Sequence, residues 1–111
     1  MPIKTKENTT NIVKHVVMWK FKEFAQGRTK EENLMLVKSM LEKLPEKIDF
    51  IRSMEVRLNE NPKEGMYDAV LISTFDSLSD VERYRVHPEH KAISSYVSLV
   101  REDRASVDFT V

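Results

Sequence analysis

Residues 12–22 form a short, strongly apolar segment with polar residues near its ends, so this segment is predicted to form a β-strand. One side of the strand holds one histidine and three apolar residues: His15, Val17, Trp19 and Phe21. The other side also has an apolar centre, Val16 and Met18. A strand face that meets water is normally polar, because successive side chains point to opposite faces. Apolar centres on both faces therefore predict that each is covered, by a second layer or by a second subunit.

A helical pattern follows after Gly27. Thr29-Lys30-Glu31-Glu32 fits a capping box, in which the threonine hydroxyl and the Glu32 carboxylate each accept a hydrogen bond from the other residue's backbone amide. An apolar stripe continues at helical spacing: Leu34, Val37, Leu41 and Leu44. This pattern predicts a helix that begins after Thr29 and ends near Pro45.

A second helical region is divided by Pro88. The stretch Ser79-Asp80-Val81-Glu82 repeats the capping-box pattern and predicts a short helix that runs through Tyr84. Proline cannot continue that helix, but it suits the first turn of a new one. The new helix has one apolar face: Ile93, Tyr96, Val97 and Val100. Two basic residues, Arg101 and Arg104, are expected near its C-terminal end, where the helix dipole favours positive charge.

Three more alternating segments are predicted strands: residues 54–58, 66–75 and 105–111. The middle one is apolar on both faces at its centre and is therefore expected inside the sheet. The order of elements predicts an α+β, ferredoxin-like β-α-β-β-α-β fold with a split second helix. Polar residues 1–11 are expected to form a flexible N-terminal arm, and residues 12–111 a single domain.

The predicted sheet has both helices on one face, which leaves its other face without a covering layer. That face includes the apolar centres of the first and third strands, and an exposed apolar area of this kind predicts a partner. Two copies that pack sheet against sheet about a two-fold axis close into a barrel. We therefore expect a homodimer through the sheet faces, a dimeric α/β barrel.

Charge and composition narrow the classes of function. The chain has 111 residues with 18 basic and 18 acidic side chains, so its formal net charge is zero. This balance gives no electrostatic reason to expect nucleic acid or an anionic membrane as a partner. The absence of cysteine excludes disulfides, thiolate metal ligands and a cysteine nucleophile. The only glycines are Gly27 and Gly65, so no phosphate-binding loop and no nucleotide cofactor is expected.

Features of targeting and membrane insertion are also missing from the sequence. The first ten residues are polar and lack the apolar core of a signal peptide. No apolar run approaches the roughly 20 residues that a membrane span requires. A cytoplasmic location is therefore expected.

Candidate chemistry centres on His15 and on the stretch Tyr84-Arg85-Val86-His87-Pro88-Glu89-His90. An imidazole titrates near neutral pH and can take up a proton, and a phenol hydroxyl can donate to a developing enolate oxygen. The competing interpretation is that Tyr84 and His90 only satisfy backbone groups beside the proline, and that His15 is a core histidine. His87 is ranked below His90 as a pocket residue, because it can cap the second half of the helix.

A metal site is the other chemical possibility. The three histidines and Glu89 supply nitrogen and oxygen donors. However, His-x-x-His across a proline turn is not an established metal motif, and no thiolate supports it. No metal site is therefore predicted.

Along residues 12–111 the chain resembles the stress-responsive dimeric α/β-barrel (Dabb) family. Several stretches carry the resemblance: Val13 to Lys22, Tyr67 to Leu71, Thr74-Phe75, Tyr84 to His90, Val100 to Arg104, and Val107 to Phe109. The H-P-x-H turn at His87 to His90, together with Lys14-His15 in the first strand, is a fairly specific feature of this family. The resemblance implies a homodimer with a sheet-lined barrel, and it implies no single function.

A plant member of that family, olivetolic acid cyclase, closes a linear polyketide by an aldol condensation. It shares three polar residues with this chain at corresponding positions: His15, Tyr84 and His90. The chain differs at Ala69 and Val37, where the cyclase has a histidine and a tyrosine. Trp19 replaces a smaller aliphatic residue and is expected to fill part of the cavity. The resemblance therefore implies the same polar trio, but not the same substrate.

The leading interpretation is a homodimeric domain that binds a small apolar or weakly acidic ligand between sheet and helices. Six residues are expected to line that site: His15, Val17, Trp19, Leu71, Tyr84 and His90. One alternative is a cofactor-independent cyclase or isomerase, or a monooxygenase-like enzyme, with His90 as general base and Tyr84 as oxyanion donor. The other is a structural oligomer without a ligand site.

Overall fold

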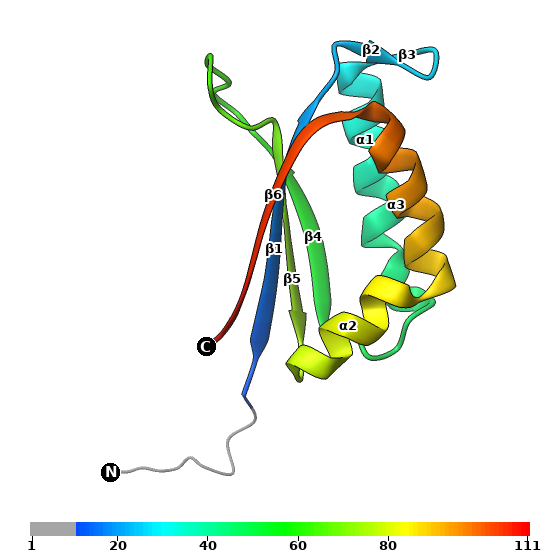
Figure 1. Cartoon of the computed structure of the whole chain (residues 1–111), viewed down its shortest axis with the longest axis vertical. Helices are drawn as coiled ribbons and strands as arrows, with labels where there is room; N and C mark the ends of the chain where they lie inside the picture. Colours follow the sequence, from blue (N-terminus) through cyan, green and yellow to red (C-terminus); the bar gives the residue numbers. More distant parts are fainter. Residues whose placement is uncertain (1–10) are drawn as a thin grey trace.

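Helices α1 and α3 run side by side along one face of a four-stranded antiparallel sheet in the computed structural model of the chain (Figure 1). The structure describes residues 11–111, so all of the predicted N-terminal arm except Asn11 lies outside the described residues. The sheet has the strand order β4-β5-β1-β6. Its strands are β1 (Val13–Phe21), β4 (Ser53–Leu58), β5 (Ala69–Phe75) and β6 (Arg101–Thr110).

The predicted ferredoxin-like fold is confirmed. Helix α1 (Lys30–Glu42) follows β1, and the second helical region consists of α2 (Leu78–Val86) and α3 (Pro88–Val100). The split falls between them at Pro88, as expected, because proline starts α3 and cannot continue α2. The His87 ring caps α3, since its Nδ1 accepts from the Glu89 amide at 3.1 Å.

The start of α1 also follows the prediction. Thr29 Oγ1 accepts from the Glu32 amide at 3.2 Å, and Glu32 Oε1 accepts from the Thr29 amide at 2.9 Å, which completes the capping box. The helix ends at Glu42, and the short 3-10 helix η2 (Leu44–Glu46) follows it with Pro45 in its first turn. Before the helix, a small hairpin joins β2 (Phe24–Ala25) to β3 (Arg28–Thr29).

Two predicted boundaries are wrong near α2 and β5. Ser77, not Ser79, caps α2, because Ser77 has extended backbone angles and its hydroxyl accepts from the Asp80 amide at 3.1 Å. Strand β5 begins at Ala69 rather than at residue 66. The preceding Asp68 is held outside the strand, where its carboxylate accepts from the Phe21 amide at 2.8 Å.

The largest error concerns the last strand, which begins at Arg101 rather than at residue 105. Helix α3 passes directly into β6, because the end of β1 offers a pairing edge for residues 101–104. Arg104 is therefore not near the end of a helix but in the sheet, opposite Trp19. Because the strand begins earlier than predicted, the guanidinium group of Arg104 lies on the helix-facing side of the sheet.

The other side of the sheet carries apolar residues on three strands, which we call the open sheet face: Val16, Met18, Val70, Ile72, Val107 and Phe109. Met18, Val107 and Phe109 are 39%, 55% and 42% exposed, although side chains of this kind are usually buried. The helices do not reach this face. An apolar area on the uncovered side of the sheet is what the apolar centres on both faces of residues 12–22 predict.

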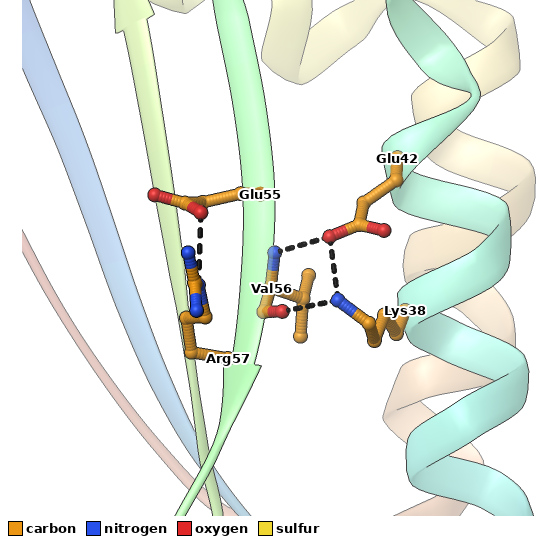
Figure 2. A network of polar contacts seen from close by, with 5 residues as sticks. All are labelled: Lys38, Glu42, Glu55, Val56 and Arg57. Carbon is orange, nitrogen blue, oxygen red and sulfur yellow. Dashed lines mark hydrogen bonds and ion pairs between the residues drawn. The ribbon is translucent and has the colours of Figure 1, made fainter.

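At one edge of the sheet, two side chains of α1 satisfy the outward-facing backbone of β4 (Figure 2). Glu42 Oε2 accepts from the Val56 amide at 3.0 Å, and Lys38 Nζ donates to the Val56 carbonyl at 2.7 Å. Lys38 and Glu42 also pair with each other at 2.8 Å. The two side chains thus occupy the position that a further strand could otherwise take.

Replacing Glu42 by alanine is expected to lower the free energy of unfolding by about 1–3 kcal/mol, because the Val56 amide loses its acceptor and Lys38 loses its partner. Urea denaturation measures the change. Glu55→Ala is the matched control, since within residues 11–111 Glu55 pairs only with exposed Arg57 and its loss should cost less than about 0.5 kcal/mol. Equal effects of the two variants would contradict this role of Glu42.

The same carboxylate predicts a dependence of stability on pH. Burial acts to raise the pKa of Glu42, but the hydrogen bonds from Lys38 and Val56 outweigh it and hold this pKa below its usual value. The folded state therefore binds this proton less readily than the unfolded chain. The contribution of Glu42 is fully present above the unfolded pKa of about 4.3 and is lost as pH falls through the lower folded pKa, below which wild type and Glu42→Gln should converge.

Candidate functional site

A cavity of about 300 Å³ lies between the helix-facing side of the sheet and the split helical region. All six residues expected at the site line it: His15, Val17, Trp19, Leu71, Tyr84 and His90. Trp19 forms part of the wall and leaves this volume open. The structure therefore brings the predicted residues together, and their role in binding stays a prediction.

Tyr84 projects from α2 and is 0% exposed. Its ring lies 4.2 Å from the His90 ring and 5.3 Å from the Phe75 ring, measured between centroids. Burial raises the pKa of Tyr84 well above its usual range, so the phenol keeps its proton at neutral pH. Among the described residues 11–111, the Tyr84 hydroxyl has no hydrogen-bond partner. A buried donor of this kind is one that a bound molecule can satisfy.

The missing partner leads to a prediction about Tyr84→Phe. Loss of an unpaired buried hydroxyl should leave the free energy of unfolding unchanged or raise it by up to about 1 kcal/mol. Tyr96→Phe is the contrasting variant, because the Tyr96 hydroxyl donates to Asn33 at 2.5 Å and accepts from Arg28 at 3.1 Å. That variant should cost about 1–2 kcal/mol in the same urea titration. A comparable loss of unfolding free energy in the two variants would show that the Tyr84 hydroxyl has a hydrogen-bond partner.

His90 lies in the first turn of α3, close to the end of α2. Its Nδ1 is 3.1 Å from the Arg85 carbonyl oxygen, which can only accept, so Nδ1 carries the proton. In the neutral ring Nε2 is then left as a hydrogen-bond acceptor or base. Burial lowers the pKa of His90 and outweighs the hydrogen bond to the Arg85 carbonyl, which acts to raise it; the nearby guanidinium groups of Arg85 and Arg104 act in the lowering direction. The ring is therefore neutral at physiological pH.

His15 is 3% exposed on β1, and its Nδ1 lies 2.5 Å from Asp108 Oδ1 on the neighbouring strand β6. The carboxylate accepts from Nδ1, which fixes the orientation of the ring. The ring stands edge-on to Tyr84, with 5.9 Å between centroids. Asp108 was not predicted as a functional residue. A signal was present, because Ser106 and Asp108 form a polar row in the last strand.

Three arginines also line the cavity: Arg85, Arg101 and Arg104. They come from α2, from the junction of α3 with β6, and from β6 itself. Burial lowers the pKa of Arg104, and the neighbouring Arg85 and Arg101 act in the same direction. Sequence reasoning missed this cluster, since it assigned Arg101 and Arg104 to the end of a helix.

Other candidates do not converge on the cavity. His87 is used as the cap of α3, and Glu89 pairs with Lys47 at 3.4 Å. Ala69 and Val37 are buried in the core. Across residues 11–111, no group of three or more histidines and carboxylates is arranged to hold a metal ion.

No helix in the described part of the chain is both long and apolar enough to cross a membrane.

Comparisons with known proteins agree with this architecture. One similar crystal structure is that of a protein from Bacteroides fragilis, described as dimeric, of unknown function and with a ferredoxin-like fold. Its sequence is 40% identical to this chain, and the match covers 90% of this chain and 96% of that one with a TM-score of 0.76. A dimeric ferredoxin-like protein of unknown function from Thermobifida fusca is 19% identical over 99% of this chain and 100% of that one, with a TM-score of 0.76.

Hydroxynitrile lyase from Passiflora edulis shares the fold at 13% identity, with a TM-score of 0.77 over 93% of this chain and 95% of the lyase. No curated protein matches the chain. The family model for the stress-responsive A/B barrel domain matches residues 13–111, nearly the whole of the described chain. This match and the 40% identity to the Bacteroides fragilis protein show that the chain belongs to the stress-responsive A/B barrel domain family.

Proposed function

We propose that the protein binds a small apolar or weakly acidic molecule in the cavity between its sheet and its helices. The observation that carries this proposal is the buried Tyr84 hydroxyl, which lines the cavity without a partner among residues 11–111. A structural oligomer without a ligand site gives no reason for an open cavity beside an unsatisfied donor. A cavity that combines an apolar wall with convergent polar groups is typical of sites for small molecules.

The fluorescence of Trp19 provides the test, because it is the only tryptophan of the chain and lines the cavity. Titration with alcohols and carboxylic acids of six to twelve carbons should change its emission and saturate at micromolar to low millimolar concentration. A flat response to the whole series, with no bound molecule in equilibrium dialysis, would contradict the proposal.

We also propose that the protein forms a homodimer through the open sheet face. The 40% identical Bacteroides fragilis protein is described as dimeric, and the apolar open sheet face supports the same arrangement here. Two such faces packed about a two-fold axis bury the exposed Met18, Val107 and Phe109. The cavity lies on the opposite side of the sheet, so each subunit keeps its own site. The expected cytoplasmic location stays a prediction.

A cofactor-independent cyclase or isomerase is the second candidate function. It is favoured by the pairing of a neutral His90, whose Nε2 is free to act as a base, with a protonated Tyr84 that can donate to an enolate oxygen. Hydroxynitrile lyase shares the fold, which is an analogy of architecture only. For any substrate found, His90→Gln and Tyr84→Phe should each lower kcat by at least about a hundredfold. Unchanged turnover would exclude this mechanism.

A further inference from the structure

We propose that the ligand is an organic carboxylate whose acidic group lies between the Arg104 guanidinium and the Tyr84 hydroxyl. The inference rests on the proposed function, because it specifies the chemical class of molecule that the same cavity takes. It is carried by the polar side of the cavity, where α2, α3 and β6 meet and where three arginines and the unpaired phenol line one space.

The arginines have few anions to balance them. Arg85 approaches Glu82 at 3.6 Å, while neither Arg101 nor Arg104 forms an ion pair within residues 11–111. The charge of Asp108 acts on Arg104, but this carboxylate is already held by His15 at 2.5 Å. Arg85 and Arg104 are exposed, and Arg101 is half-buried. Like charges held close to one another repel, so an anion bound between them is stabilising.

Arg104 has the most favourable position for the main contact. It stands opposite Trp19 in the register of β6 with β1, so its side chain is on the same helix-facing side as the aromatic wall. Its charge also acts on Tyr84, where it favours the ionised phenol against the stronger effect of burial on the pKa. A carboxylate can accept from the guanidinium and from the phenol together, which satisfies both groups.

The rest of the cavity fits an apolar body. Its other walls include six aliphatic or aromatic residues: Val17, Trp19, Leu41, Leu71, Ile93 and Val97. A volume of about 300 Å³ lies at the lower end of the range for small-molecule sites, which is roughly 300–1,000 Å³. The combination selects a monocarboxylate with a short alkyl or aryl body rather than a highly charged metabolite.

Paired titrations of Trp19 emission with octanoate and 1-octanol at neutral pH test this inference. The two molecules have the same chain and differ in the anionic group. Wild-type protein should bind octanoate at least about tenfold more tightly, which corresponds to one charge-assisted hydrogen bond. Arg104→Gln should remove that preference and leave the affinity for octanol unchanged. Arg52→Gln is the matched control, because Arg52 is an exposed arginine that pairs with Asp76 and does not line the cavity.

Each outcome separates the two proposals. Equal affinities for octanoate and octanol would overturn the carboxylate inference and leave ligand binding in the cavity standing. No binding of any acid or alcohol from six to twelve carbons would overturn both. Inorganic phosphate that competes fully with octanoate would show an anion site that does not select carboxylates, and would overturn the inference as stated. If Arg104→Gln does not fold, Tyr84→Phe must lower the affinity for octanoate more than the affinity for octanol, because a carboxylate accepts from the phenol more strongly than an alcohol does.

Discussion

Replacing Val107 by glutamate is expected to convert the proposed dimer into monomers. Val107 lies on the open sheet face opposite Val16 and is 55% exposed in the single chain, so the substitution leaves the subunit core intact. In a two-fold interface it buries two carboxylates without partners, and each such charge costs several kcal/mol. The dissociation constant should therefore rise by at least about a hundredfold, measured by light scattering after size exclusion.

Leu78→Glu is the control for that experiment. Leu78 is 56% exposed at the start of α2, away from the open sheet face, and a glutamate suits the first turn of a helix. In light scattering this variant should still have twice the molar mass of a single chain, as expected for a dimer. A wild-type protein that is monomeric at micromolar concentration, or a Val107→Glu variant that remains dimeric, would contradict the proposed interface.

The second large effect is expected for Ser94→Phe. Ser94 is an exposed residue of α3 that lines the cavity, so a phenyl ring there should occupy the space without disturbing the core. Octanoate and octanol should each lose at least about tenfold in affinity, because the ring replaces the volume that their chains need. Trp19 emission and equilibrium dialysis report the change.

The neighbouring residue offers a matched control. Ser95 is exposed on the same helix and does not line the cavity, so Ser95→Phe adds the same ring to a different face. It should bind both ligands like the wild type. If both variants lose binding, the effect comes from the helix and not from the cavity; if neither does, the ligand binds elsewhere.

Much of the fold was predictable because its elements have strong periodic patterns. The apolar centre of residues 66–75 predicted a strand inside the sheet, and β5 pairs with β4 and β1. The capping box at Thr29 and the proline at the start of α3 placed two helix starts correctly. These signals are local, so they do not depend on which segments meet in space.

The site was only partly predictable, because its electrostatics depend on a strand register. The stretch Arg101 to Arg104 has four charged residues, which is also typical of a helix end. Only pairing with β1 turns it into a strand and sets Arg104 opposite Trp19. The same register brings Asp108 beside His15. Pairing between strands that are far apart in the chain cannot be predicted from the spacing of residues in a single sequence.

The polar trio was easier to find than its surroundings. Tyr84 and His90 lie six residues apart, which is not a helical repeat, and they meet because the chain turns at Pro88 between α2 and α3. The cavity itself could not be predicted, since it is the space that aliphatic side chains such as Leu41 and Val97 leave open between helices and sheet.

A crystal structure of the protein soaked with octanoate tests the central claim most directly. We expect the alkyl chain in the cavity beside Trp19, with the carboxylate within about 3.2 Å of both the Tyr84 hydroxyl and the Arg104 guanidinium. Electron density for the ligand only on the protein surface, or a cavity that stays empty while octanoate binds in solution, would contradict the account.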